Sequence, residues 1–205
     1  MSRKIVAILR GITPEEVVDV ASAIVEAGIS IVEVPLNSPS AVSSIRNLAL
    51  ALCDKALIGA GTVLSVDQVD AVADAGGRII VSPNCDLAVI QRGLDLSMSC
   101  MPGVFTATEC FNAINAGITQ LKLFPALLLG PSVLQAFKAV LPPQIELFAV
   151  GGVSTSNFAE WVAAGISGFG IGTSLYQPGD SVADVSLRSR EIVKSYDAAC
   201  VKAAG

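Results

Sequence analysis

The sequence predicts an α/β fold in which eight parallel strands, each followed by a helix, close into a single (β/α)8 TIM barrel. Three observations predict it: short apolar runs recur along the chain, helix-length stretches with polar faces separate them, and the turn signals between them repeat. About eight such units fill residues 1–205 with no linker left over, so we expect one barrel domain. A doubly wound open sheet is the main alternative.

The predicted strands are short runs rich in β-branched and other apolar residues. They cover residues 5–9, 30–34, 57–58, 79–81, 98–101, 121–124, 147–150 and 169–171. Strands of this length that alternate with helices are typical of βαβ units, in which successive strands run parallel.

The predicted helices carry recurring start and end signals. Helix starts are marked at Thr13, Ser38, Ser65 and Thr106. Three of these begin a Ser/Thr-x-x-Glu/Gln motif, in which side chains satisfy free N–H groups of the first turn, and two are followed by proline. Helix ends are marked by an Ala-Gly pair, because glycine accepts the left-handed conformation that closes a helix. The pairs are Ala27-Gly28, Ala75-Gly76, Ala116-Gly117 and Ala164-Gly165.

The composition excludes several classes of partner. The formal net charge is −5 and the basic residues are not clustered, whereas nucleic-acid binding by counterion release needs grouped Lys and Arg. The longest uncharged stretch, residues 161–179, is interrupted by glycines and Pro178 and lacks the apolar run of a membrane-spanning helix. No signal-peptide pattern follows Met1, so we expect a cytoplasmic protein whose partner is a small molecule.

The titratable residues limit the possible chemistry. The five cysteines are scattered and form no CxxC pair, which argues against a disulfide framework or a zinc site. The chain has no histidine, so it lacks the commonest metal ligand and the commonest general base at neutral pH. Catalysis would have to use Lys, Glu or Asp, Tyr or Cys, without a metal. Cys85 and Cys100 are interpreted as small hydrophobic residues, because no histidine is available to activate them.

The active site of such a barrel lies at the carboxyl ends of its strands. The unusual residues of this chain fall there, in strand order: Arg10-Gly11, Glu33, Gly61-Thr62, Pro83-Asn84, Pro102-Gly103, Lys122, Gly151-Gly152 and Gly172-Thr173-Ser174. Glu33 and Lys122 stand out because each is a charge within an apolar strand, which is costly unless the ion is paired, neutralised or near water.

Glu33 and Lys122 have two interpretations. They can form a structural ion pair inside the barrel, and such pairs also perturb pKa values. Alternatively, burial lowers the pKa of Lys122 and leaves part of it as a free amine, which is what attack on a ketone requires. Burial would then raise the pKa of Glu33 toward neutrality and suit it to move protons.

The other candidate residues also have two interpretations each. Arg10 is either a surface residue or a planar fork that binds a substrate carboxylate. Thr62 can simply cap a turn. Gly151-Gly152 is either a tight turn or a phosphate cradle, in which glycines bring backbone N–H groups toward the anion. Phe124 is expected to pack along the wall of the pocket.

Taken together, these segments resemble the KDPG/KHG aldolase family nearly from end to end. The resemblance is carried, in this order and spacing, by Ile8-Leu9-Arg10-Gly11-Ile12, Val32-Glu33-Val34-Pro35-Leu36-Asn37-Ser38-Pro39, Ile58-Gly59-Ala60-Gly61-Thr62-Val63, Val81-Ser82-Pro83-Asn84, Met101-Pro102-Gly103, Leu121-Lys122-Leu123-Phe124-Pro125 and Ala149-Val150-Gly151-Gly152-Val153.

The resemblance implies a class I aldolase barrel that is a homotrimer and needs no cofactor. It implies that Lys122 forms a Schiff base with pyruvate or a phosphorylated keto-sugar acid, and that Glu33 acts as acid and base through a bound water. The residues that it implies for substrate binding are Arg10 and Thr62 at the pyruvate carboxylate, Gly151, Gly152 and Ser174 around the phosphate of glyceraldehyde 3-phosphate, and Pro83 and Phe124 in the pocket.

Two departures from the gluconate pattern resemble the galactonate branch of the family. Asn37 stands where gluconate enzymes usually carry arginine, and Val150 stands where they carry threonine. Val150 can be an ordinary core residue, but an isopropyl group near the new stereocentre would bias which aldehyde face reacts. The resemblance therefore implies cleavage of 2-dehydro-3-deoxy-6-phosphogalactonate, with the gluconate or 4-hydroxy-2-oxoglutarate activity as the alternative. Residues 126–129 are more apolar than the family pattern.

Two rival functions remain open at this point. One is a phosphosugar isomerase or epimerase that enolises its substrate without a covalent lysine. The other is a non-catalytic barrel that binds sugar phosphates. Only the aldolase would form a reducible adduct with pyruvate on Lys122.

Overall fold

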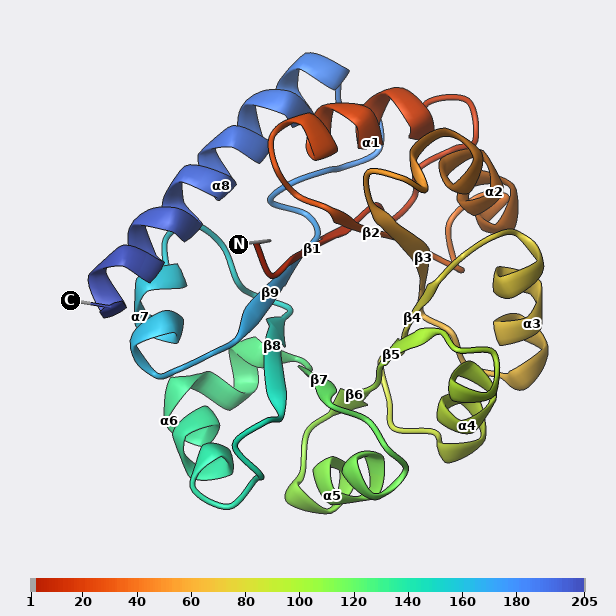
Figure 1. The fold of residues 1–205 in the computed structure, drawn as a ribbon. Helices are drawn as coiled ribbons and strands as arrows, with labels where there is room; N and C mark the ends of the chain where they lie inside the picture. Colours follow the sequence, from red (N-terminus) through yellow and green to blue (C-terminus); the bar gives the residue numbers. More distant parts are fainter. Residues whose placement is uncertain (1–2, 205) are drawn as a thin grey trace.

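Nine parallel strands form one sheet in the computed structural model, which describes residues 3–204. The strands are β1 (Ile5–Ile8), β2 (Ile31–Pro35), β3 (Leu57–Gly61), β4 (Ile79–Val81), β5 (Ser99–Met101), β6 (Gly103–Val104), β7 (Gln120–Leu123), β8 (Glu146–Val150) and β9 (Gly168–Ile171). The helices are α1 (Val17–Glu26), α2 (Ala41–Leu52), α3 (Val66–Asp74), α4 (Leu87–Asp95), α5 (Ala107–Asn115), α6 (Ala126–Lys138), α7 (Phe158–Ala163) and α8 (Val182–Ala204). Figure 1 shows the sheet curled into a ring with the helices outside it.

The ring closes at the fifth predicted strand. The strand order is β5-β4-β3-β2-β1-β9-β8-β7-β6, so β5 and β6 lie at the two ends of the sheet. They are also consecutive in the chain, separated only by Pro102, whose carbonyl accepts a hydrogen bond of 2.9 Å from the Lys122 N–H. The two are therefore halves of one strand. The predicted (β/α)8 barrel is confirmed, and the alternative, a doubly wound open sheet, is not what the chain forms. All eight predicted strands are present, and the third extends to Gly61 rather than ending at 58.

The Ala-Gly helix ends are confirmed. The last residues of α1, α3, α5 and α7 are each followed by a capping alanine and then by a glycine with positive φ. At the end of α1, for example, Gly28 has φ 101° and its N–H bonds the Val25 carbonyl. Closing each helix in this way turns the chain directly into the next strand.

Two of the four predicted helix starts are confirmed and two lie later in the chain. Thr106 forms a complete capping box at α5, and Ser65 accepts a hydrogen bond from the Gln68 N–H at α3. The helix expected from Ser38 begins instead at Ala41, because the Ser38 hydroxyl accepts the Gly11 N–H at 2.9 Å. The helix expected from Thr13 begins at Val17, after a turn.

Alternation along the strands separates an outer from an inner layer of side chains. The outer residues, such as Val32 and Val34 of β2, pack with the helices in the main hydrophobic core. A smaller apolar cluster fills the inside of the barrel and consists of Val6, Ile79, Val81, Met101 and Phe148. Because side chains alternate between the two faces of a strand, Glu33 and Lys122 must face inward when their neighbours face the helices.

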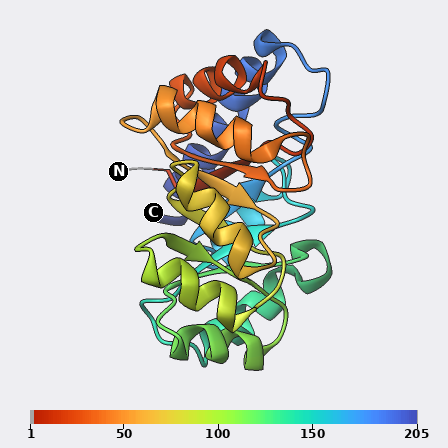
Figure 2. The ribbon, with the colours of Figure 1, turned by 90° about the vertical axis from the view of Figure 1, so that its right-hand side faces the viewer.

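The amino end of the barrel is closed by a polar network. Lys4 Nζ bonds Glu146 Oε1 at 2.5 Å, and Gln120 Nε2 donates to Glu146 Oε2 at 3.0 Å. The described chain, residues 3–204, begins and ends at this side of the barrel (Figure 2). With this network and the apolar inner cluster below them, Glu33 and Lys122 face the opposite, carboxyl end.

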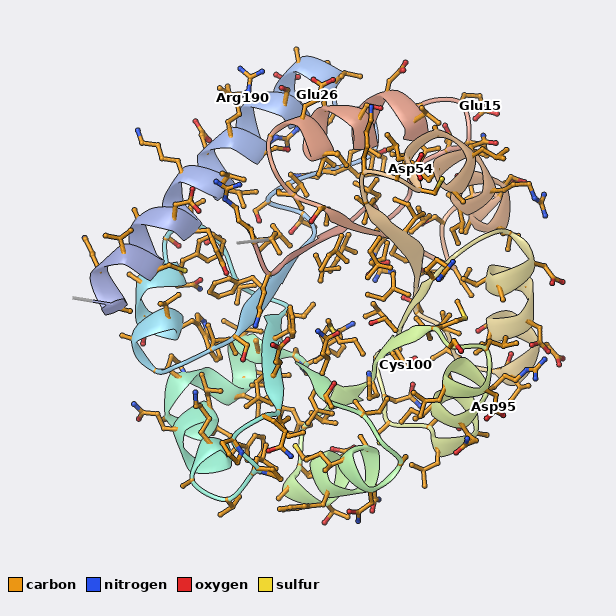
Figure 3. The ribbon with its side chains drawn as sticks, in the orientation of Figure 1. Glu15, Glu26, Asp54, Asp95, Cys100 and Arg190 are labelled. Carbon is orange, nitrogen blue, oxygen red and sulfur yellow. The ribbon has the colours of Figure 1, made fainter. Side chains whose placement is uncertain are left out.

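Charged side chains cover the outside of the ring. Figure 3 shows Glu15, Asp95 and Arg190 pointing away from the barrel, whereas Cys100 lies between β5 and α4. Cys100 needs a small neighbour on α4, because a Cβ at residue 93 would collide with its Sγ. Residue 93 is glycine. Within residues 3–204, no helix is both long enough and apolar enough to cross a bilayer.

Candidate functional site

A pocket of about 410 Å³ opens at the carboxyl ends of the strands. It is of the size that binds small molecules, and its wall is formed by strands from both halves of the barrel. The predicted site residues that line it are Arg10, Glu33, Lys122, Phe124, Val150, Gly151, Gly152 and Ser174. Residues that are distant in the chain therefore come together at the carboxyl ends of the strands, as the sequence predicts.

Thr62 and Pro83 lie at the ends of β3 and β4 but are not part of this wall. Thr62 is half-buried and adopts a left-handed conformation with φ 56°. A β-branched residue rarely adopts this conformation, and strained backbone of this kind is concentrated at functional sites. Pro83 is also half-buried, and its carbonyl occupies the space that a side chain at Gly103 would need. Their contact with substrate stays a prediction.

The sequence interpretation missed the part of the wall that follows Ser174. Tyr176, Gln177 and Pro178, in the connection from β9 to α8, line the pocket. Pro178 packs against Gly11, where a Cβ would lie 2.7 Å from the proline Cγ. The Tyr176 hydroxyl donates to Glu16 Oε1 at 3.2 Å. No local motif marks this segment, because its place is set by contacts with the distant β1–α1 connection.

The turn after β8 is closed by the start of α6. Gly151 and Gly152 have φ 88° and 80°, conformations that other residues rarely adopt. The Leu127 N–H donates to the Gly151 carbonyl at 2.9 Å, and a Cβ at residue 152 would lie 2.6 Å from the Leu127 Cβ. The unusually apolar segment 126–129 therefore supports the glycine turn, although Leu127 and Leu128 are each 72% exposed.

Glu33 lies inside the barrel and is only 2% exposed. Burial raises the pKa of its carboxyl group to about 7, against the smaller lowering effects of the Lys122 and Arg10 charges and the Gly61 N–H. Among the described residues, Glu33 Oε2 has no hydrogen-bond partner. A buried carboxyl group with a pKa near neutrality and a free oxygen can both accept and return a proton at the pH of the cell.

Lys122 faces the same pocket and is 6% exposed. Burial lowers the pKa of its ammonium group, the Glu33 carboxylate raises it, and the nearby Arg10 charge lowers it further, with a net lowering. Its Nζ lies 4.5 Å from the centre of the Phe124 ring. None of the ion pairs found among residues 3–204 joins Lys122 to Glu33, but the charge of each group shifts the pKa of the other.

The two groups face one cavity and are its candidate nucleophile and candidate proton carrier. Their pKa values are shifted toward each other, which favours the free amine of Lys122 and the protonated carboxyl of Glu33 compared with exposed groups of the same kinds. Within the described part of the chain, no group of three or more acidic or cysteine side chains is arranged to hold a metal ion. The cationic side chain on the pocket wall besides Lys122 is Arg10, which suits a carboxylate ligand.

Gly61 makes room for the Glu33 carboxylate, a role that the sequence interpretation did not assign. A Cβ at residue 61 would lie within 3.0 Å of both carboxylate oxygens of Glu33. We therefore expect Gly61→Ala to displace the carboxylate and to lower kcat for the reaction at this site by about 10²-fold, since a shift of roughly 1 Å has that effect.

Steady-state kinetics on Gly61→Ala would check this, with Ala60→Gly as the matched control on the same strand. Ala60 is buried on the outer face, so its replacement should change stability but not kcat. Normal turnover in Gly61→Ala would contradict this prediction, because the Glu33 carboxylate would then keep its position despite the added methyl group.

The comparisons with known proteins agree with this geometry. The model of the family described as KDPG and KHG aldolase matches residues 1–190. A probable 2-dehydro-3-deoxy-6-phosphogalactonate aldolase from Rhizobium meliloti (strain 1021) is 50% identical over 97% of this chain and 93% of its own length. The 2-dehydro-3-deoxy-6-phosphogalactonate aldolase of Escherichia coli (strain K12) is 48% identical over 94% of each chain. A solved structure described as native KDPGal superposes with a TM-score of 0.95, 47% identity and coverage of 97% of both chains.

Proposed function

Because the chain belongs to the KDPG and KHG aldolase family, we propose that it cleaves 2-dehydro-3-deoxy-6-phosphogalactonate to pyruvate and D-glyceraldehyde 3-phosphate through a Schiff base on Lys122. The enzyme is an aldolase, which is a carbon–carbon lyase. The observation that carries the proposed mechanism is the pair Glu33 and Lys122, buried in one pocket with pKa values shifted in opposite directions. The similarity to the two galactonate aldolases supports the substrate.

The first steps form the covalent intermediate. The free amine of Lys122 adds to the C2 ketone of the substrate, and loss of water gives a protonated imine. Arg10 and Thr62 hold the adjacent carboxylate, and Pro83 and Phe124 complete that end of the site. Gly151, Gly152 and Ser174 surround the phosphate at the other end. The imine then draws electrons more strongly than the ketone did.

Bond cleavage uses the second charged group. Glu33, through a water molecule, takes the proton of the C4 hydroxyl, and its unpartnered Oε2 is the atom that supports this role. The C3–C4 electron pair moves into the imine, which becomes an enamine as D-glyceraldehyde 3-phosphate leaves. Protonation at C3 and addition of water then release pyruvate and restore the Lys122 amine. The scheme uses no metal or organic cofactor.

Reductive trapping tests this mechanism against its rivals. Treatment with pyruvate and borohydride is expected to reduce the imine to a stable secondary amine, with the added mass mapped to Lys122 by peptide mass spectrometry. A non-covalent isomerase or epimerase, or a barrel that only binds sugar phosphates, would gain no such adduct. An adduct on a different lysine would also contradict the proposal.

Val150 is proposed to set the preference between substrate epimers. It lines the pocket and packs over Gly170, where a Cβ would lie 2.7 Å from its Cγ2. Val150→Thr keeps the volume but adds a hydroxyl near the carbon atoms that react. We expect it to shift the ratio of kcat/KM for the galactonate and gluconate epimers about tenfold toward gluconate.

Parallel assays of both epimers would measure this ratio. Val34→Thr is the control, because Val34 is equally buried but faces the helices, so the ratio should not change. Equal rates of the unmodified enzyme on the two epimers would contradict the role of Val150 and favour the broader gluconate or 4-hydroxy-2-oxoglutarate activity.

We also propose that the enzyme is cytoplasmic and homotrimeric, as its resemblance to the family implies. Leu127 and Leu128 provide exposed apolar surface of the kind that subunit contacts cover. Sedimentation equilibrium should then give three times the chain mass of 21.0 kDa.

A further inference from the structure

We propose that Asn37 is a positioning residue that holds the Arg10 guanidinium on the pocket wall, so that binding of the substrate carboxylate depends on this contact. Asn37 follows β2 and does not line the pocket itself. The inference rests on the proposed function, because it assigns the carboxylate to Arg10. It adds a residue outside the pocket that controls how well the pocket binds.

Arg10 needs such a partner because its side chain is exposed. A free arginine side chain has many rotamers, and ordering it costs conformational entropy. The Asn37 Oδ1 accepts a hydrogen bond of 2.5 Å from Arg10 Nη1. Within residues 3–204 this is the one hydrogen bond of the Arg10 side chain, and the ion pairs found there involve other arginines.

The neighbouring residue fixes the backbone of the same segment. Ser38 is 8% exposed, and its hydroxyl accepts the Gly11 N–H at 2.9 Å. Gly11 has φ 84° and packs against Pro178. The second and third residues after β2 therefore contact the second and third residues after β1 in register. Ser38 places the backbone at Gly11, and Asn37 places the end of the Arg10 side chain.

A neutral amide suits this task better than a charged group. It accepts one N–H of the guanidinium and leaves the positive charge and the remaining donors of the fork for a ligand. An aspartate in its place would form an ion pair and compete with the substrate carboxylate. An arginine would repel Arg10. Arg10 interacts electrostatically with Glu33 and Lys122, which face the pocket from β2 and β7.

A double-mutant cycle tests the proposal with the full-length enzyme. Asn37→Ala is expected to raise KM for the keto-acid substrate about fivefold to tenfold, the effect of losing one ordinary hydrogen bond, with kcat within about twofold. Arg10→Ala should raise KM further. In the Arg10→Ala background, Asn37→Ala should have no additional effect on KM, because the side chain that it positions is gone.

Two further variants complete the experiment. Asn37→Asp should also raise KM, although it keeps an acceptor atom. Its carboxylate would form an ion pair with the guanidinium and compete with the substrate carboxylate. Asn112→Ala, an exposed asparagine on α5, is the matched control and should leave KM unchanged. Thermal unfolding of each variant separates loss of binding from loss of fold, and Asn37→Ala should change Tm little since Asn37 is exposed.

An unchanged KM in Asn37→Ala would overturn the proposal, and so would an effect of equal size with and without Arg10. Pyruvate trapping on Lys122 at saturating concentration should remain complete in all these variants. If trapping succeeds while the cycle shows no coupling, the positioning role is wrong and the aldolase mechanism stands. If trapping fails in the unmodified enzyme, the mechanism itself is wrong.

Discussion

Lys122→Ala is expected to lower kcat/KM for aldol cleavage by at least about 10⁴-fold, the largest effect of any single substitution in this chain. Without the amine no imine forms, and the electron pair of the breaking C3–C4 bond has no acceptor. The other cation on the pocket wall, Arg10, cannot replace it, because a guanidinium stays protonated and is a poor nucleophile. Release of pyruvate in a coupled assay measures the loss directly.

Two controls accompany this substitution. Lys194→Ala removes an exposed lysine of α8 and should keep normal turnover and normal trapping by borohydride. Lys122→Met keeps most of the buried aliphatic chain, so it should be as inactive as Lys122→Ala while unfolding at a temperature close to that of the unmodified enzyme. Normal turnover in either Lys122 variant would make the covalent scheme untenable.

Glu33→Gln is expected to lower kcat by about 10²- to 10⁴-fold, the range for loss of a general acid and base. In the unmodified enzyme the carboxyl pKa is raised to about 7, so activity should fall as the pH drops below 7 and the carboxylate becomes protonated. The residual activity of Glu33→Gln should lack this acid limb, because an amide does not titrate. A pH profile of kcat/KM that keeps the limb in Glu33→Gln would assign it to another group.

The same substitution should stabilise the fold at alkaline pH. The carboxyl pKa is 4.5 in the unfolded reference and about 7 in the folded protein, so the folded state binds the proton more tightly. Burial of the charged form therefore has no cost below about pH 4.5 and its full cost, about 3 kcal/mol, above about pH 7. Glu33→Gln removes this cost, so its gain in unfolding free energy should grow across that range. Denaturant unfolding at pH 4 and pH 8 would measure it.

Lys122→Met and Glu33→Gln should also differ in how the free energy of unfolding depends on pH. Glu33→Gln should abolish the change of stability between pH 4.5 and 7 that comes from this carboxyl group, whereas Lys122→Met should enlarge it, because it removes a charge that lowers the pKa of Glu33. A stability gain that is equal at pH 4 and pH 8 would point to packing rather than to the buried charge.

The sequence by itself determined the features that are encoded locally. Capping residues and Ala-Gly pairs mark several helix boundaries, because each signal acts within one turn of the chain. Apolar runs mark the strands, and the period of two then places Glu33 and Lys122 on the inner face, since Val32, Val34, Leu121 and Leu123 must face the helices. The resemblance to the aldolase family drew its site residues from these same segments.

Only the tertiary structure decided the contacts between segments that are distant in the chain. Closure of the ring at Pro102, the space that Gly61 leaves for Glu33, and the packing of Pro178 on Gly11 depend on which strands are neighbours and in which register. The contact between Asn37 and Arg10 spans 27 residues and is of the same kind. Such contacts arise from the geometry of the assembled barrel, and the local conformational preferences of the residues involved do not encode them.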